Sequence, residues 1–207
     1  MNSAILDIAV WALPLLVAVI LHEIAHGYVA FLLGDPTAKL LGRLTLNPLP
    51  HVDLFGTVLL PGLLIFTGAP FVFGYAKPVP VNFGRLRQPK RDMIFVAAAG
   101  PATNVVLATL SAVALHATQA PDAELGLLGM TLLYSVFINI TLAVFNMLPI
   151  PPLDGGRVAV GLLPMPLARA LAQVEPYGMM VVVVLLMTGT LGAVMGPIRK
   201  AFLGALL

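Results

Sequence analysis

The chain has 207 residues, of which 59% are hydrophobic and only 10% charged, and its formal net charge is +2. A water-soluble domain does not need that much apolar surface, so the composition predicts a polytopic membrane protein of the helical type. The absence of cysteine excludes disulfides and thiolate metal sites, and the mild positive charge, clustered in loops, indicates membrane orientation rather than nucleic-acid binding.

Continuous apolar runs predict an all-α fold with about four transmembrane helices, in a single domain that covers 1–207. The predicted spans are 4–33, 93–117, 125–148 and 177–195. A further apolar stretch, 54–73, is broken by several Gly and Pro residues and is expected to form a re-entrant or hairpin element. Partial alternation of apolar residues within 37–47 predicts a short strand at the membrane surface.

Loop charges indicate how these spans are oriented. The loops 35–53 and 76–92 are basic, whereas the loop 119–124 carries only acids. Because Lys and Arg are retained in the cytosol, the first span is expected to end inside, the second to run outward and the third to return. Both flanks of 54–73 are then cytosolic, which favours a re-entrant element. The alternative, a single crossing by 54–73, would send the third span outward.

The chemistry of the chain begins inside the first span, at His22-Glu23-Ile24-Ala25-His26. Ionisable residues are rare in membrane helices, and where they occur they indicate a functional site. Positions i and i+4 lie on one helix face, so His22 and His26 can offer two nitrogens to one metal ion. Glu23 projects to the side of that pair and could act as a general base toward water. A polar cluster that holds helices together without metal is the alternative.

A catalytic zinc ion usually has three protein ligands, so a third is required. The candidates are His51, His116 and Asp154, and behind them Asp53 and Asp35. His116 falls at the outer end of its span, far from the histidine pair. Asp154 follows the third span on the same side as the pair, in a rigid Pro-Pro-Leu-Asp-Gly-Gly turn. It could equally be the N-cap of the next helix, and the residues alone leave both roles open.

Two segments together resemble the paired signature of the site-2 proteases, which are intramembrane zinc metalloproteases. The first is His22–His26, and the second, about 130 residues later, runs from Asn146 through Pro151-Pro152-Leu153 to Asp154-Gly155. The element from Gly100 to Asn104 between them is also similar to the family, and the likeness covers most of 4–160. The chain differs from larger members in carrying no PDZ or CBS-type domain.

The resemblance implies that His22, His26 and Asp154 bind one Zn²⁺ per chain and that Glu23 is the catalytic base. It also implies cleavage of a transmembrane segment of another protein, in regulated intramembrane proteolysis. Asn146 would then bind the substrate backbone or a reacting oxygen, and Asn104 is a weaker candidate for the same role. The alternative for either residue is a hydrogen bond that holds two helices together.

His51 could be a gate residue that occupies the open coordination position of the metal when no substrate is bound. The alternative is an interfacial loop histidine with no such role. The expected partners are a transmembrane protein substrate, the lipid bilayer and a regulatory membrane protein, with no nucleic acid. The expected location is a bacterial or archaeal plasma membrane, with the active site toward the cytosol. Two other classes remain open: a zinc-binding transporter or sensor, and a scaffold that binds membrane helices without cutting them.

Overall fold

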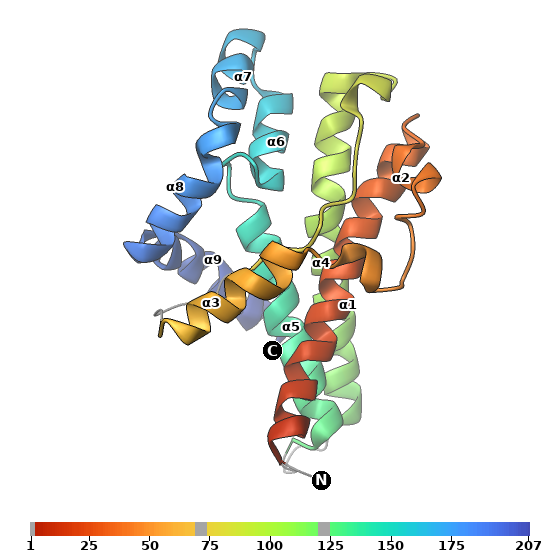
Figure 1. Ribbon diagram of the computed structural model, residues 1–207. Coiled ribbons are helices and arrows are strands. Elements are labelled where there is room, and N and C mark those ends of the chain that lie inside the picture. Colours follow the sequence, from red (N-terminus) through yellow and green to blue (C-terminus); the bar gives the residue numbers. More distant parts are fainter. Residues whose placement is uncertain (1–2, 69–73, 120–124) are drawn as a thin grey trace.

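A computed structural model describes residues 3–68, 74–119 and 125–207, and its centre is a bundle of three long helices (Figure 1). These are α1 (Ser3–Leu32), α4 (Pro89–Thr118) and α5 (Leu127–Asn146), and each packs against the other two. All three are long and apolar enough to cross a membrane, and they coincide with most of the first three predicted spans. No more than 33% of each crossing window is buried in protein, so most of its apolar surface is left for lipid. The chain is an integral membrane protein.

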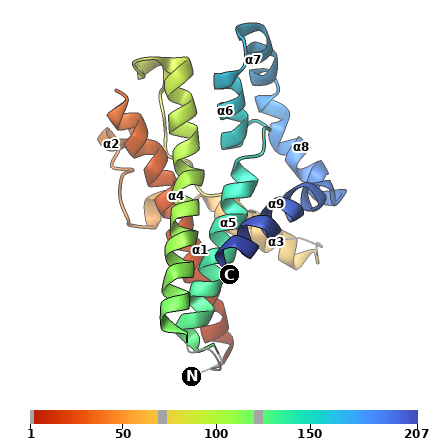
Figure 2. The same ribbon diagram turned by 180° about the vertical axis from the view of Figure 1, so that it is seen from behind.

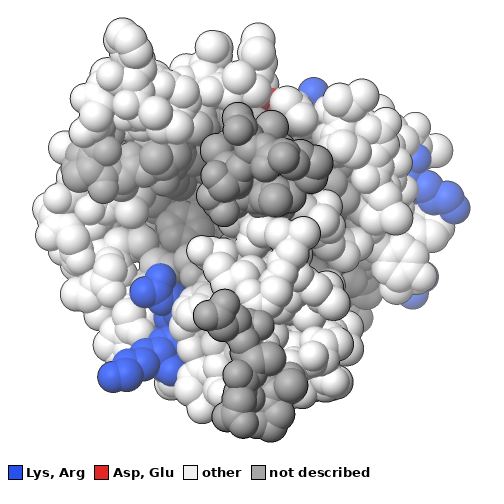
Figure 3. All heavy atoms as spheres, turned by 90° about the horizontal axis from the view of Figure 1, so that it is seen from below, with Lys and Arg blue, Asp and Glu red and all other residues white. Residues whose placement is uncertain are grey.

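The three helices alternate in direction. α1 and α5 run the same way and α4 runs back between them, so that the end of α1, the start of α4 and the end of α5 lie at one end of the bundle (Figures 1 and 2). The basic loops 35–53 and 76–92 flank this end of the bundle. Figure 3 looks onto the opposite end, where α1 begins, and the Lys and Arg side chains visible in it lie mainly at two edges of the view. This alternation is the one that the loop charges predict.

The segment after α1 is helical where a strand was predicted. Residues Thr37–Leu40 form the single turn α2, and the described residues contain no strand, so the predicted surface strand is wrong. The physical reason lies in Asp35, whose carboxylate accepts hydrogen bonds from the backbone N–H and the hydroxyl of Thr37 and so starts a helical turn. A 3₁₀ turn follows at Leu49–His51.

The broken apolar stretch forms one short helix. A π-helical turn, Leu54–Leu59, continues directly into α3, Leu60–Phe66, which lies across the front of the bundle in Figure 1. Thirteen helical residues span about 20 Å, which is less than the roughly 30 Å of a bilayer core. A single crossing by this helix is therefore excluded. Residues 69–73 of the predicted re-entrant element lie outside the described residues.

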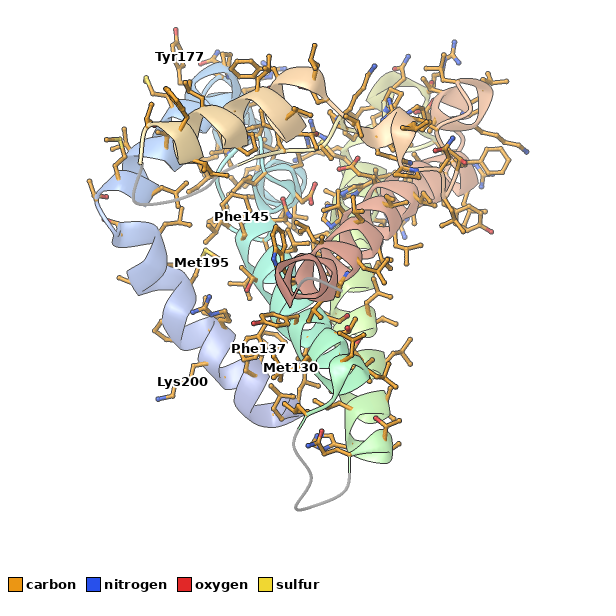
Figure 4. All side chains as sticks on the ribbon, turned by 60° about the horizontal axis from the view of Figure 1, so that its bottom comes forward. Met130, Phe137, Phe145, Tyr177, Met195 and Lys200 are labelled. Carbon is orange, nitrogen blue, oxygen red and sulfur yellow. The ribbon has the colours of Figure 1, made fainter. Side chains whose placement is uncertain are left out.

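The C-terminal part contains α6 (Asp154–Leu162), α7 (Met165–Ala172), α8 (Glu175–Met187) and α9 (Thr190–Leu206). The prediction of one span over 177–195 is wrong, because α8 ends at Met187 and the chain turns at Gly189. This residue has a φ of +73°, which favours glycine. A fourth crossing could instead be formed by α7 and α8 together, bent by 66°. In Figure 4, Met195 lies between α9 and α5, while Lys200 points away.

Candidate active site

The two histidines and the aspartate meet inside the bundle. His22 and His26 project from α1 at i and i+4, and their Nε2 atoms are 3.0 Å apart. Asp154, the first residue of α6, places Oδ2 at 3.2 Å from His22 Nε2 and 3.3 Å from His26 Nε2. All three side chains are buried. His26 lies six residues before the end of α1, so the cluster is about 9 Å or more below that end of the helix.

This triangle of atoms fits a tetrahedral metal ion. An ion with ligands at about 2.0–2.1 Å holds any two of them about 3.3 Å apart, close to the three separations observed. Within the described residues, Asp154 Oδ2 is buried without a hydrogen-bond partner. A buried acceptor left in this state costs free energy unless a cation satisfies it. The donor set of two imidazoles and a carboxylate is one that zinc prefers, and His22, His26 and Asp154 are the group whose ligand atoms converge.

The outer nitrogens of both rings are already occupied. His26 Nδ1 donates to the carbonyl of Val96 at 2.7 Å, and His22 Nδ1 is 2.6 Å from Asn104 Oδ1. A neutral imidazole that donates through Nδ1 presents the lone pair of Nε2, so both lone pairs point into the cluster. Asn104 is itself fixed, since its amide donates to Asn139 Oδ1 at 2.8 Å and it has no exposed surface. Asn104 thus orients a ring, as partners of metal ligands commonly do.

Local backbone geometry aims Asp154 at the histidines. A Cβ on Gly155 or Gly156 would collide with the backbone of the Met147–Pro151 turn, so only glycine lets α6 start this close to the end of α5. Leu153, not Asp154, is the N-cap of α6, which makes the helix-cap alternative wrong. Burial raises the pKa of Asp154, but the two histidines that face its carboxylate outweigh burial and lower that pKa to about 2, so the side chain is a carboxylate at neutral pH.

Gly100 of α4 forms the wall behind the histidines. A Cβ at this position would lie 2.6 Å from His22 Nε2 and closer still to His26 Nε2. We therefore expect Gly100→Ala to displace both rings and to weaken zinc binding roughly 10–100-fold, the usual effect of disturbed ligand orientation. Titration with a zinc-buffered chelator measures the affinity. Gly196→Ala in α9, where a Cβ meets nothing within 4 Å, is the control and should bind zinc as wild type does. Equal affinities for the two variants would contradict this geometry.

Glu23 lies beside the cluster and is half-buried. Its Oε2 accepts a hydrogen bond from the backbone N–H of Val79 at 2.7 Å. Among the described residues no hydrogen bond engages Oε1. In the described part of the chain, one carboxylate oxygen is thus held by the backbone and the other has no hydrogen-bond partner, which is compatible with proton transfer by Glu23.

The remaining predicted residues lie elsewhere. Asn146, at the end of α5, donates its amide back to Leu142 of its own helix. His51 is 3% exposed and its Nε2 contacts the carbonyl of Thr45. Three candidates for the third ligand have other partners: His116 contacts the carbonyl of Leu206, Asp53 accepts from the N–H of Gly56, and Asp35 binds Thr37 and Asn82. None of these belongs to the convergent group in the described part of the chain.

Comparisons with known proteins identify relatives that are named as zinc metalloproteases. The model of Peptidase family M50 matches residues 10–122 and 115–189. The chain is 38% identical to a Bacillus subtilis protein named "Putative zinc metalloprotease YwhC", over 91% of this chain and 85% of that protein. It is 36% identical to "Putative zinc metalloprotease Rip2" of Mycolicibacterium smegmatis, over 90% of this chain and 68% of that one, and 32% identical to the Mycobacterium tuberculosis protein of that name, over 85% and 66%. No solved structure matches.

Proposed function

The chain belongs to Peptidase family M50 and is a membrane-embedded zinc metalloprotease, and from this premise we propose that it cuts a transmembrane segment of another membrane protein. One observation carries the proposal: His22 and His26 lie within the candidate span Val10–Leu32, and the Asp154 carboxylate meets them there. A peptide bond must therefore come to membrane depth to reach it. Family membership also favours catalysis over the transporter and scaffold alternatives.

In this proposal His22, His26 and Asp154 hold the zinc ion. Zinc at such a site polarises a carbonyl group and lowers the pKa of water. Glu23 takes one proton from the attacking water through its free Oε1. The water oxygen bonds to the scissile carbonyl carbon, Glu23 delivers the proton to the departing amide nitrogen, and the C–N bond breaks. The products are an amine and a carboxylic acid, which loses its proton to water and becomes a carboxylate.

The loop charges support an active site toward the cytosol. The cluster lies nearer the end of α1 than its start, and that end is flanked by the basic loops 35–53 and 76–92. A substrate helix hides its peptide bonds in its own hydrogen bonds, so it has to unwind before attack. The proposed substrate class is therefore a single-span protein whose helix is weakened near its cytosolic end, cut in response to a signal or a regulatory membrane partner.

The test is cleavage of a single-span peptide in detergent or vesicles by the purified full chain. With two glycines near the cytosolic end of the peptide we expect cleavage there. Replacing both glycines by leucine strengthens the local helix by about 1.5 kcal/mol, which should slow cleavage roughly tenfold. Mass spectrometry locates the cut, and an unstructured soluble peptide of the same flanking sequence is the comparison. Cutting only the soluble peptide would contradict the intramembrane proposal.

A further inference from the structure

An extended segment crosses α1 beside the active site. This segment, Lys77–Asn82, is here named the strap. The N–H of Val79 donates to Glu23 Oε2, and the Val79 side chain is 6% exposed. That side chain sits over Gly27, where an added Cβ would lie 2.7 Å from Val79 Cγ1. Glu23 and Gly27 are at i and i+4, so one face of α1 binds the strap while His22 and His26 line the neighbouring face.

The strap is anchored on both sides of Val79. Before it, Arg43 donates to the carbonyl of Lys77 at 2.8 Å, and the Lys77 N–H donates to the carbonyl of His51 at 2.9 Å. After it, the N–H of Asn82 donates to Asp35 Oδ2 at 2.6 Å. The three anchoring residues are 9%, 3% and 0% exposed in the order Arg43, His51 and Asp35. Pro78 and Pro80 fix the backbone on either side, so the Val79 N–H has little freedom to turn away.

The strap also leads directly to the other half of the site. Phe83, the next residue after the strap, packs under the guanidinium of Arg157 at 5.4 Å from the ring centre. Arg157 lies on α6, three residues after Asp154. One continuous segment thus contacts both the helix that carries Glu23 and the helix that carries the third predicted ligand.

We propose that the backbone N–H of Val79 is a positioning group that holds the Glu23 carboxylate in register with the metal cluster. This proposal rests on the proposed protease function, in which Glu23 is the general base. A glutamate on a helix can adopt several rotamers, and few of them point one oxygen toward the cluster. The bond to Val79 fixes Oε2 and leaves Oε1 free. Arg43, His51 and Asp35 then act on catalysis through the strap rather than through the metal.

The direct test deletes the donor. Val79→Pro removes the N–H and adds a third proline to an extended segment that already holds Pro78 and Pro80. With a single-span peptide that the wild type cleaves, we expect kcat to fall roughly 10–100-fold, with KM within about twofold of wild type. Zinc content should stay at one per chain. The amide-to-ester replacement at Val79, which keeps the side chain and deletes only the N–H, should lower kcat in the same way.

The matched control is Val79→Ala, which keeps the N–H but loses the packing on Gly27. Its kcat should fall clearly less than that of Val79→Pro. Unchanged kcat in both the proline and ester variants would overturn the proposal. A rise in kcat would overturn it as well and would identify the strap as an inhibitory contact on Glu23. Equal losses of kcat in Val79→Ala and Val79→Pro would show that the strap acts through side-chain packing and not through the Val79 N–H. If the wild type cleaves no peptide, the proposed function fails instead, so the two failures are distinguishable.

Discussion

Glu23→Gln is expected to abolish proteolysis while leaving the metal centre intact. Gln has almost the same shape as Glu, and its amide oxygen can still accept the hydrogen bond from the Val79 N–H. It cannot take a proton from water, so the contribution of general-base catalysis is lost, roughly 10²–10⁴-fold in kcat. Cleavage of a single-span peptide, with zinc measured by elemental analysis on the same preparation, checks both halves of this expectation.

The informative outcome is the combination of the two measurements. Loss of cleavage with one zinc per chain assigns Glu23 to the chemistry. Loss of both would indicate that Glu23 supports the cluster instead. Cleavage at the wild-type rate would exclude Glu23 as the base and with it the proposed mechanism. Val79→Pro is a useful comparison because it keeps the Glu23 carboxylate but removes the group that positions it. Its loss of kcat should therefore be smaller than that of Glu23→Gln.

The first half of the site could be predicted from the sequence because helix geometry is regular. His22 and His26 are four residues apart in an apolar run, so any helix there brings the two rings together. The second half of the site, Asp154, could not be placed without knowing how the helices pack. Asp154 could be a ligand or a cap from local sequence alone, and only the packing of α6 against the end of α5 places Oδ2 at 3.2–3.3 Å from both histidines.

Contacts between helices could not be predicted in the same way. Gly100 lies 74 residues after His26, and its role comes from the rotation and register of α4 against α1. Val79 lies in a basic loop between two prolines, and its bond to Glu23 depends on anchors at Arg43, His51 and Asp35. Such long-range pairs leave no periodic signal in a single sequence.

The two wrong predictions of secondary structure have local causes. Apolar composition is the same for one straight span as for two helices that meet at an angle, so hydropathy could not locate the break at Gly189. Partial alternation in 37–47 was weaker than the side-chain bonds of Asp35, which start a helical turn at Thr37. In both cases a single residue determined the backbone where a pattern over ten or more residues did not.

Asp154→Ala is expected to remove zinc binding and the stability that zinc confers. In the metal-free wild type, three acceptor atoms face one another at 3.0–3.3 Å, an arrangement that destabilises the fold. Zinc at 100 times its dissociation constant should stabilise the wild type by about 2.7 kcal/mol. Asp154→Ala deletes one acceptor, so at the same zinc concentration we expect little or no rise in Tm. Thermal unfolding in detergent, with and without a chelator, measures the difference.

The same variant separates a ligand from a merely structural carboxylate. A structural Asp154 would make the chelated variant less stable than the chelated wild type. A ligand predicts the reverse order or equality, because removing Asp154 relieves the crowding of acceptors. Asp53→Ala is the matched control, since this carboxylate caps a helical turn outside the cluster, and its Tm should still rise with zinc as the wild type does. A zinc-dependent rise in Asp154→Ala equal to that of the wild type would rule out Asp154 as a ligand and direct attention to the oxygens of the neighbouring turn.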